Sequence, residues 1–349
     1  MLKVVALLFA LIGTAAQAAV VMQYHHVSES SPRVTSVTPA EFRSHMQFLA
    51  DNQFKVMPLR DLVAMVQRGE EPPLRAVAIT FDDGYQNIAD EAVPILKEFG
   101  FPYTLFVSID PMLKGHKGMM TEATLKRLAR DGAEIANHSF AHDHLIRKLP
   151  GETDADWKAR IRSDLLATEK TLEQIRGKAV QPMLAYPFGE YNGALQQLIK
   201  ELGMVAFGQQ SGAMGRYSDL TAIPRFPFGG AYGTLESVKE KLWSLPLPVK
   251  ALSPADPHLT KDFGPLLSVT LADVSDIQTS ALRCFLPNEG AVTPTWVSAT
   301  EFSVRASKEL PAGRSRYNCT APSKSQKGYY WFSQAWVRAN KDGSWPKEP

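Results

Sequence analysis

Residues 77–87 read VAITFDDGYQN, and this stretch decides how the rest of the chain is interpreted. Val77, Ala78 and Ile79 form an apolar run with β-branched residues, which predicts a buried strand. Two aspartates follow it directly, although adjacent like charges repel each other, and more strongly when they are partly buried. Asp and Gly are also common in turns. The motif is therefore either a simple turn or a pair of carboxylates held by a cation at the end of a strand.

Apolar strands alternate with amphipathic helices over residues 19–244, which is typical of an α/β domain with a largely parallel sheet. Besides the strand before Asp82, we expect strands at residues 19–24, 103–108 and 133–137, and weaker ones at 183–186, 204–207 and 221–226. Helical spacing of apolar residues predicts helices over residues 39–52, 89–100, 121–132 and 154–175.

The first 18 residues have the order of a secretory signal peptide. Lys3 precedes the apolar run VVALLFALIGTAA, and small residues at 16–18 suggest cleavage before Ala19. A membrane anchor is the alternative, but the run is shorter than the ~20 residues that a spanning helix needs. We expect an exported protein, periplasmic or secreted. The 349-residue chain has a formal charge of +2, which argues against a nucleic-acid partner.

The composition changes after residue 244. Residues 245–258 contain four prolines, which predicts a stiff, extended linker. Over residues 259–349, short alternating runs broken by Gly, Pro and Asn predict a small, all-β, sandwich-like domain. The only two cysteines, Cys284 and Cys319, lie there. In an exported protein such a pair suggests one disulfide, although two free buried thiols are the alternative.

Three further motifs follow predicted strands. His138 and His142, in NHSFAH, are placed to bind one ion through their imidazoles, although His144 offers a competing partner and loop histidines are common. Residues 185–192 read AYPFGEYN, whose aromatic residues either bind sugar rings or pack a loop. His25 ends the first strand, and the ends of parallel strands face the active site in α/β folds. His26 should point to the opposite face.

Together TFDDGY, HSFAH and YPFG resemble the metal-dependent polysaccharide deacetylases, carbohydrate esterase family four. The opening YHHV, the segment TPAEFRSHMQFLADNQFKVMPLRDL and the position of TFDDGY are most similar to the poly-N-acetylglucosamine deacetylase branch. The resemblance covers roughly residues 20–230. It implies a distorted (β/α) barrel, followed here by the β-sandwich-like domain, and a hydrolase that removes N-acetyl groups from a polysaccharide of N-acetylglucosamine type.

The resemblance also implies roles for individual residues. Asp82 matches the catalytic base and Asp83 the metal-binding carboxylate. His138 and His142 match the histidine ligands of a divalent ion, most consistent with zinc. Phe188 matches the residue whose N–H holds the oxyanion, and the permuted branch points to His25 as the general acid. The family's arginine in the third motif is replaced by Ala185, so Arg225 is a candidate to orient the base. We assign substrate binding to Tyr186, Pro187, Phe188 and Arg225.

Other functions fit parts of the pattern. An esterase that removes O-acetyl groups would use the same residues. A non-catalytic carbohydrate-binding protein would not need a general base, and a zinc peptidase would carry a helical His-Glu-x-x-His motif. The expected partner is an acetylated polysaccharide. The C-terminal domain either binds glycan or a protein partner, or serves as a structural cap.

Overall fold

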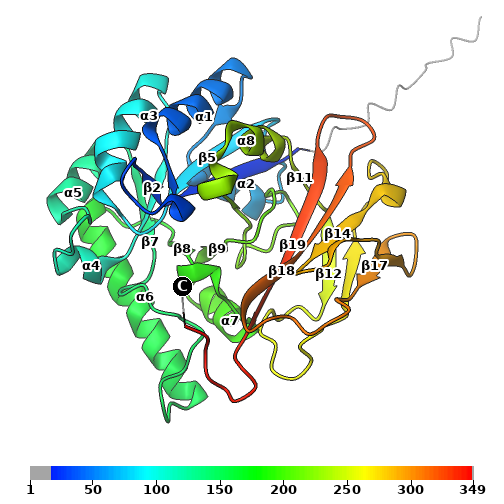
Figure 1. Ribbon diagram of the computed structural model, residues 1–349. Coiled ribbons are helices and arrows are strands. Elements are labelled where there is room, and N and C mark those ends of the chain that lie inside the picture. Colours follow the sequence, from blue (N-terminus) through cyan, green and yellow to red (C-terminus); the bar gives the residue numbers. More distant parts are fainter. Residues whose placement is uncertain (1–16, 348–349) are drawn as a thin grey trace, which may run out of the picture.

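A computed structural model describes residues 17–347 (Figure 1). The predicted signal peptide, residues 1–18, lies outside the described residues except for its last two positions. An α/β unit, coloured blue to green, lies beside an all-β unit, coloured yellow to red. Between residues 17 and 347, no helix is both long enough and apolar enough to cross a membrane.

The α/β unit is built around one parallel sheet of order β10–β1–β5–β6–β7–β8–β9, with β4 also paired to β5. A parallel bridge between Phe207 in β9 and Ile223, just before β10, connects the two edges. The sheet is a distorted barrel, which confirms the expected fold class. Its strands are β1 (Ala19–Tyr24), β4 (Lys55–Val56), β5 (Ala76–Phe81), β6 (Thr104–Val107), β7 (Glu134–Asn137), β8 (Met183–Ala185), β9 (Val205–Phe207) and β10 (Phe226–Pro227).

Strands β1 and β5 are parallel neighbours in this sheet. They pair along their whole length, from Ala19 opposite Ala76 to Tyr24 opposite Phe81. All six residues of each strand are buried. A parallel strand that is covered on both faces has a continuous apolar sequence, and this is why the run before Asp82 was recognisable.

Helices lie outside the barrel (Figure 1). The longest is α6, whose first turn carries a capping box between Thr153 and Asp156 and which ends at Gly177 in the left-handed conformation. A second capping box, between Thr38 and Glu41, begins α1. The α-helices are α1 (Pro39–Asp51), α2 (Leu59–Gln67), α3 (Val93–Phe99), α4 (Ile109–Leu113), α5 (Glu122–Arg130), α6 (Asp154–Arg176), α7 (Gly193–Glu201) and α8 (Leu235–Leu242).

The all-β unit consists of two sheets with a shared apolar core, which confirms the predicted sandwich-like domain. The core contains Leu267, Phe302, Tyr317 and Trp336. One sheet has the order β11–β19–β18–β14–β15 and the other β12–β13–β17–β16. The strands are β11 (Leu245–Pro246), β12 (Val249–Ser253), β13 (Leu267–Leu271), β14 (Arg283–Leu286), β15 (Gly290–Val292), β16 (Thr295–Trp296), β17 (Glu301–Val304), β18 (Gly313–Pro322) and β19 (Tyr329–Arg338).

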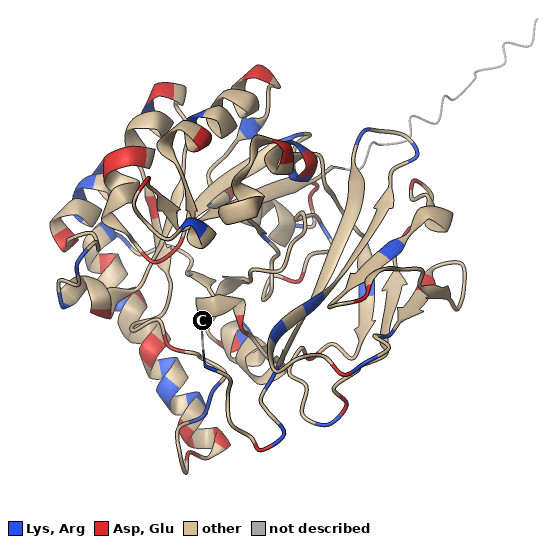
Figure 2. Ribbon diagram, viewed as in Figure 1, with Lys and Arg blue, Asp and Glu red and all other residues tan. Residues whose placement is uncertain are grey.

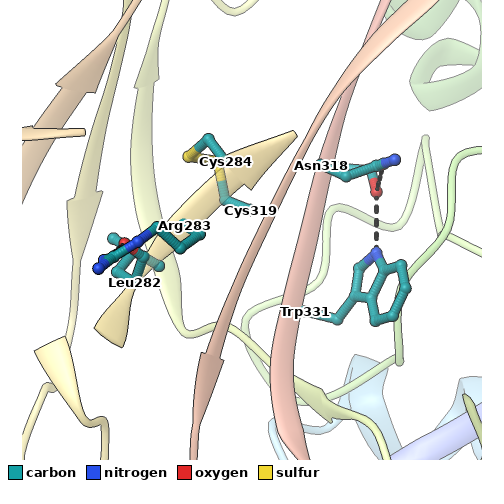
Figure 3. Close-up of a disulfide and its surroundings, with 7 residues drawn as sticks. Leu282, Arg283, Cys284, Asn318, Cys319 and Trp331 are labelled. Atoms are coloured by element: carbon teal, nitrogen blue, oxygen red, sulfur yellow. Dashed lines mark hydrogen bonds between the residues drawn. A yellow bond between two sulfur atoms is a disulfide. The ribbon is translucent and has the colours of Figure 1, made fainter. Parts of the chain in front are cut away.

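Cys284 and Cys319 form a disulfide, as the sequence suggested (Figure 3). They lie directly opposite each other on the neighbouring strands β14 and β18. Both sulfur-bearing residues are fully buried in the sandwich core. The bond therefore links two strands that are already hydrogen-bonded.

The prediction of a linker over residues 245–258 is wrong for half of this segment. β11 pairs with β19, and β12 pairs with β13, so the segment supplies a strand to each sheet of the all-β unit. Both strands lie at sheet edges, where proline is tolerated because one side of the strand makes no ladder hydrogen bonds. Proline content alone could not distinguish an edge strand from an extended linker.

The two units pack against each other. The ring of Trp331 in β19 meets Phe226 in β10 edge-on, with centroids 5.2 Å apart. Val337, also in β19, is buried in the same apolar cluster as Leu184 and Tyr186. Strand β19 therefore provides apolar contacts between the sandwich and the barrel.

Candidate active site

The predicted site residues come together at the carboxyl ends of the parallel strands. Asp82 follows β5 directly, His138 follows β7, and Phe188 lies in the short 3-10 segment Pro187–Gly189 after β8. His25 lies in the bend after β1. In an open or closed parallel sheet this is the edge at which ligands bind.

Asp82 is fully buried and held by three donors. Arg225, also fully buried, donates from Nη1 to Oδ1 at 2.7 Å and from Nη2 to Oδ2 at 2.8 Å. Gln23 in β1 donates from Nε2 to Oδ2 at 2.6 Å. Burial raises the pKa of Asp82, but the charges of Arg225 and then His138 outweigh it, so the pKa lies below its usual range. The carboxylate is therefore kept ionised.

Asp83, His138 and His142 form the second part of the site. Asp83 Oδ1 lies 3.1 Å from His138 Nε2 and 3.3 Å from His142 Nε2. One ligand atom from each of the three residues lies within 4.8 Å of the others. Such spacing is what ligands of one ion adopt when their bonds are about 2.0–2.2 Å long.

The donor atoms of this cluster fit a cation. Asp83 Oδ1 and His138 Nε2 are both buried. Although they lie 3.1 Å apart, the angles between them do not fit a hydrogen bond, so neither atom has a hydrogen-bond partner. His138 Nδ1 lies 2.8 Å from the carbonyl oxygen of Ala185, which can only accept, so this nitrogen carries the hydrogen. When His138 is neutral, as a histidine that binds a metal must be, its lone pair is then on Nε2, the atom that faces Asp83.

Tight turns aim these ligands. Asp83 and His142 both adopt positive φ, 73° and 61°, a conformation that costs non-glycine residues of order 1 kcal/mol and is common at functional sites. Gly84 follows with φ 93°, and a Cβ there would meet Val107 Cγ1 at 3.1 Å. The sequence DDG is thus both a turn and a site, so the two interpretations of the motif are compatible.

His144 does not belong to the ligand cluster. Its Nδ1 lies 2.8 Å from Glu190 Oε2, and its ring stacks on Phe188 with centroids 3.8 Å apart. Glu190 is almost fully buried and also contacts Arg147 and, from β18, Arg314. Burial raises the pKa of Glu190, but the hydrogen bond with His144 and the nearby cations lower it overall.

Glu190 and Gln23 are two site residues that sequence reasoning missed. Gln23 could have been noticed, because it is the single amide in the otherwise apolar strand AVVMQY. Glu190 gave no such signal, since an acidic residue in a loop is ordinary. Its partners come from two separate parts of the chain, the loop that contains His144 and Arg147 and the distant strand that contains Arg314.

His25 is partly exposed beside both aspartates. Burial raises the pKa values of Asp82 and Asp83, and the nearest cationic groups lower them most. The charge of His25 lowers both pKa values by a smaller amount, so His25 lies within electrostatic range of both carboxylates. The expectation that His26 points away is wrong. The chain bends at His25, and the His26 ring stacks on Tyr85 with centroids 3.8 Å apart.

Three of the four predicted substrate-binding residues need correction. Tyr186 is fully buried and donates its hydroxyl hydrogen to the carbonyl oxygen of Thr221, and Pro187 is also buried, so neither offers a wall to a ligand. Arg225 contacts Asp82 and is shielded from solvent, so it holds that carboxylate in place instead of meeting a ligand. Phe188 is partly exposed, and its ring lies 4.6 Å from that of His142.

Comparison with known proteins agrees with this geometry. Residues 69–207 match the family described as polysaccharide deacetylase. YxkH of Bacillus subtilis strain 168, a protein named after the polysaccharide deacetylases, is 27% identical over 226 residues, which cover 63% of this chain and 76% of that one. A poly-β-1,6-N-acetyl-D-glucosamine N-deacetylase of Staphylococcus aureus strain MRSA252 is 28% identical over 212 residues, covering 58% and 71%.

Among solved structures, PplD, a Streptococcus pyogenes deacetylase, superposes with a TM-score of 0.57 at 20% identity, covering 65% of this chain and 99% of that chain. This likeness concerns the fold. The chain therefore carries a polysaccharide deacetylase domain, and the expected enzyme class, a hydrolase, is confirmed with it. Within that family its similarity extends to the poly-N-acetylglucosamine deacetylases.

Proposed function

We propose that this protein is an exported, metal-dependent deacetylase that hydrolyses N-acetyl groups of a polysaccharide of N-acetylglucosamine type. The observation that carries the proposal is the position of Asp82. It is an ionised, buried carboxylate, fixed by Arg225, directly next to a cluster of metal-ligating type. A sugar-binding protein without catalysis would have no use for this pairing.

Asp83, His138 and His142 would hold a divalent ion, and their mixed oxygen and nitrogen donors favour zinc. When bound, such an ion supplies Lewis acidity towards a carbonyl oxygen and towards water. Three protein ligands would leave further coordination positions for water or substrate, as catalytic rather than structural sites do.

Asp82 acts as the general base. A carboxylate has about four lone-pair positions, and Arg225 and Gln23 occupy three of them. The remaining position, on Oδ1, accepts a proton from the attacking water. Because Arg225 and Gln23 fix the plane of the carboxylate, this position has a defined direction, as proton transfer requires.

Two further groups act on the acetamide. The N–H of Phe188, on the turn beside His142, stabilises the negative charge that develops on the acyl oxygen. His25, on the other side of the aspartates, donates a proton to the nitrogen of the leaving amine. Water thus forms the new C–O bond, the C–N bond breaks, and acetate and a protonated amine are released.

Acetate release tests the proposal. Purified protein is incubated with β-1,6-linked and chitin-type N-acetylglucosamine oligomers, peptidoglycan and O-acetylated glycans, with chelator or with added zinc. We expect release from an N-acetylated glycan that stops with chelator and returns with zinc. Release from O-acetylated glycans alone would indicate an esterase, and release that chelator does not affect would contradict the metal role.

Export and cleavage before Ala19 are a separate part of the proposal, supported by the order of residues 1–18. The intact mass of protein recovered from the periplasm or medium should correspond to a chain that begins at Ala19. Recovery of full-length protein from the cytoplasm alone would contradict it.

A further inference from the structure

The all-β unit supplies one wall of a cavity beside the active site. The cavity has a volume of about 160 Å³. Phe188, Gln209 and Pro227 line it from the α/β unit, and Arg314 and Arg316 line it from β18. Since Phe188 also faces His142, the cavity adjoins the ligand cluster.

Strand alternation directs the two arginines towards the α/β unit. Tyr317 and Cys319 point into the sandwich core, so Arg314 and Arg316 occupy the same face as their partners on β19, Val337 and Ala335. Val337 packs in the cluster that contains Tyr186 of the α/β unit. Figure 2 shows basic residues on the part of β18 that lies nearest to that unit.

The positive charge at this wall exceeds the nearby negative charge. Glu190 lies 3.1 Å from Arg147 and 3.5 Å from Arg314, so one carboxylate faces two guanidinium groups. Arg316 forms no ion pair with any residue from 17 to 347. Burial lowers the pKa of Lys241 in α8 to about 8. The charge of Glu240 opposes this shift and the charge of Arg316 adds to it, so Arg316 acts electrostatically on the α/β unit.

The chemistry of arginine decides what such a wall can bind. A guanidinium offers only N–H donors, which suit the carbonyl oxygen of an acetamide and the oxygens of sugar hydroxyls. Hydrolysis of an acetamide leaves an amine, which takes up a proton at neutral pH. The resulting ammonium group has no acceptor to offer and is repelled by the arginines.

We propose that the cavity binds the sugar next to the one being deacetylated, and that Arg314 and Arg316 select an N-acetylated neighbour over one that carries a free amine. The inference rests on the proposed function. Each turnover then creates a neighbour that the cavity disfavours, so adjacent sugars are deacetylated more slowly than separated ones. The C-terminal unit would thereby determine the spacing of free amines along the polymer.

The test compares two N-acetylglucosamine oligosaccharides of equal length. Both carry one isotope-labelled acetamide at the same position, but in one of them the neighbouring sugar has a free amine. Release of labelled acetate gives kcat/KM for the same bond in each. At low ionic strength we expect the wild type to favour the fully acetylated oligosaccharide by about 3- to 30-fold, and 0.5 M salt should reduce this ratio.

Arg316→Gln is the main variant. Arg314 is less suitable alone, because its guanidinium carbon lies 5.4 Å from the centroid of the Phe188 ring, and its loss would also change the surroundings of Phe188. We expect the ratio to fall towards one in Arg316→Gln and further in the double variant with Arg314→Gln. Arg283→Gln removes the same charge from β14 of the same sheet, away from the cavity, and should keep the wild-type ratio.

A wild-type ratio near one would overturn the proposal, as would an equal loss on both oligosaccharides in the arginine variants. A wild type that releases no acetate would instead contradict the proposed function. Binding of the same two oligosaccharides to Asp82→Asn protein, measured by calorimetry, then tests the selectivity of the cavity without any need for turnover. Tighter binding of the fully acetylated oligosaccharide, which is lost in the double variant of Asp82→Asn and Arg316→Gln, would support the selectivity. Equal binding of the two oligosaccharides to Asp82→Asn protein would refute it.

Discussion

Arg225 donates a hydrogen bond to each carboxylate oxygen of Asp82, at 2.7 and 2.8 Å, although the two residues are 143 positions apart in the chain. Both side chains are completely shielded from solvent. The pair connects the segment before β10 to the end of β5, two strands that lie on either side of β1. It is therefore both a structural contact and part of the proposed active site.

Replacing Arg225 by Met should strongly destabilise the protein, because Asp82 would remain as a buried charge without its partner. Losses of this kind are typically about 3–5 kcal/mol in the free energy of unfolding. Urea denaturation measures the effect. Arg43→Met removes an ion pair with Glu98 at the surface and should change stability little. Similar small effects of both variants would contradict the role given to the buried pair.

The metal cluster makes a prediction about stoichiometry. Purified protein should contain about one divalent ion per chain, and the triple alanine variant of Asp83, His138 and His142 should contain none. Elemental analysis reads this directly. His144→Asn is the matched control, because His144 lies in the same loop but contacts Glu190 instead. Loss of the ion in the control, or its retention in the triple variant, would refute the assignment.

Asp164 on α6 should make stability depend on pH. Burial raises the pKa of its carboxyl to about 6, well above the value of an unfolded chain. The folded state therefore binds more protons than the unfolded state between about pH 4 and pH 6, and stability falls as pH rises through this window. Asp164→Asn keeps an oxygen for the Phe140 N–H and should gain about 1–2 kcal/mol at pH 7.

Urea unfolding of both proteins at several pH values measures this slope. The gain in Asp164→Asn should shrink as the pH is lowered and disappear near pH 3, where the wild-type carboxyl is largely protonated in both states. Asp154→Asn, at the exposed start of the same helix, should keep the wild-type slope. A gain that is independent of pH would mean that titration of Asp164 is not the cause.

His25 should matter most when the leaving group needs a proton. His25→Gln should retain the ion but lose a factor of about 10² to 10⁴ on an amide. An activated aryl acetate should be affected far less, since its leaving alcohol departs as the anion. His26 is unsuitable as a control because it stacks on Tyr85, so exposed His116 replaces it. Equal losses on both substrates would assign the acid elsewhere.

The sequence allowed the fold and the ligand cluster to be predicted because their signals are local. Buried parallel strands have largely apolar sequences, and Asp83, His138 and His142 lie within five residues of the ends of such strands. Gln23 and Glu190 were missed because their roles depend on partners that only the tertiary fold brings near. No spacing rule connects Glu190 to Arg314, which comes from the other unit.

The errors have similar physical causes. Tyr186 belongs to an aromatic motif, but the motif does not tell which rings face the core, and this one lies beside Tyr191 under the loop. His26 was expected to alternate with His25, but the strand ends one residue earlier and the chain bends. The prolines of residues 245–258 suited edge strands as well as a linker.

Acetate release by Asp82→Asn tests the central claim most directly, because this change removes the basicity of the side chain and keeps its shape. The assay uses the N-acetylated glycan on which the wild type is most active, with the metal content and thermal unfolding of both proteins measured in parallel. We expect turnover lower by about 10² to 10⁴ in protein that binds the ion and is folded at the assay temperature, with a lower unfolding temperature because buried Arg225 loses its charged partner. Turnover within about threefold of the wild type, with the ion bound, would contradict it.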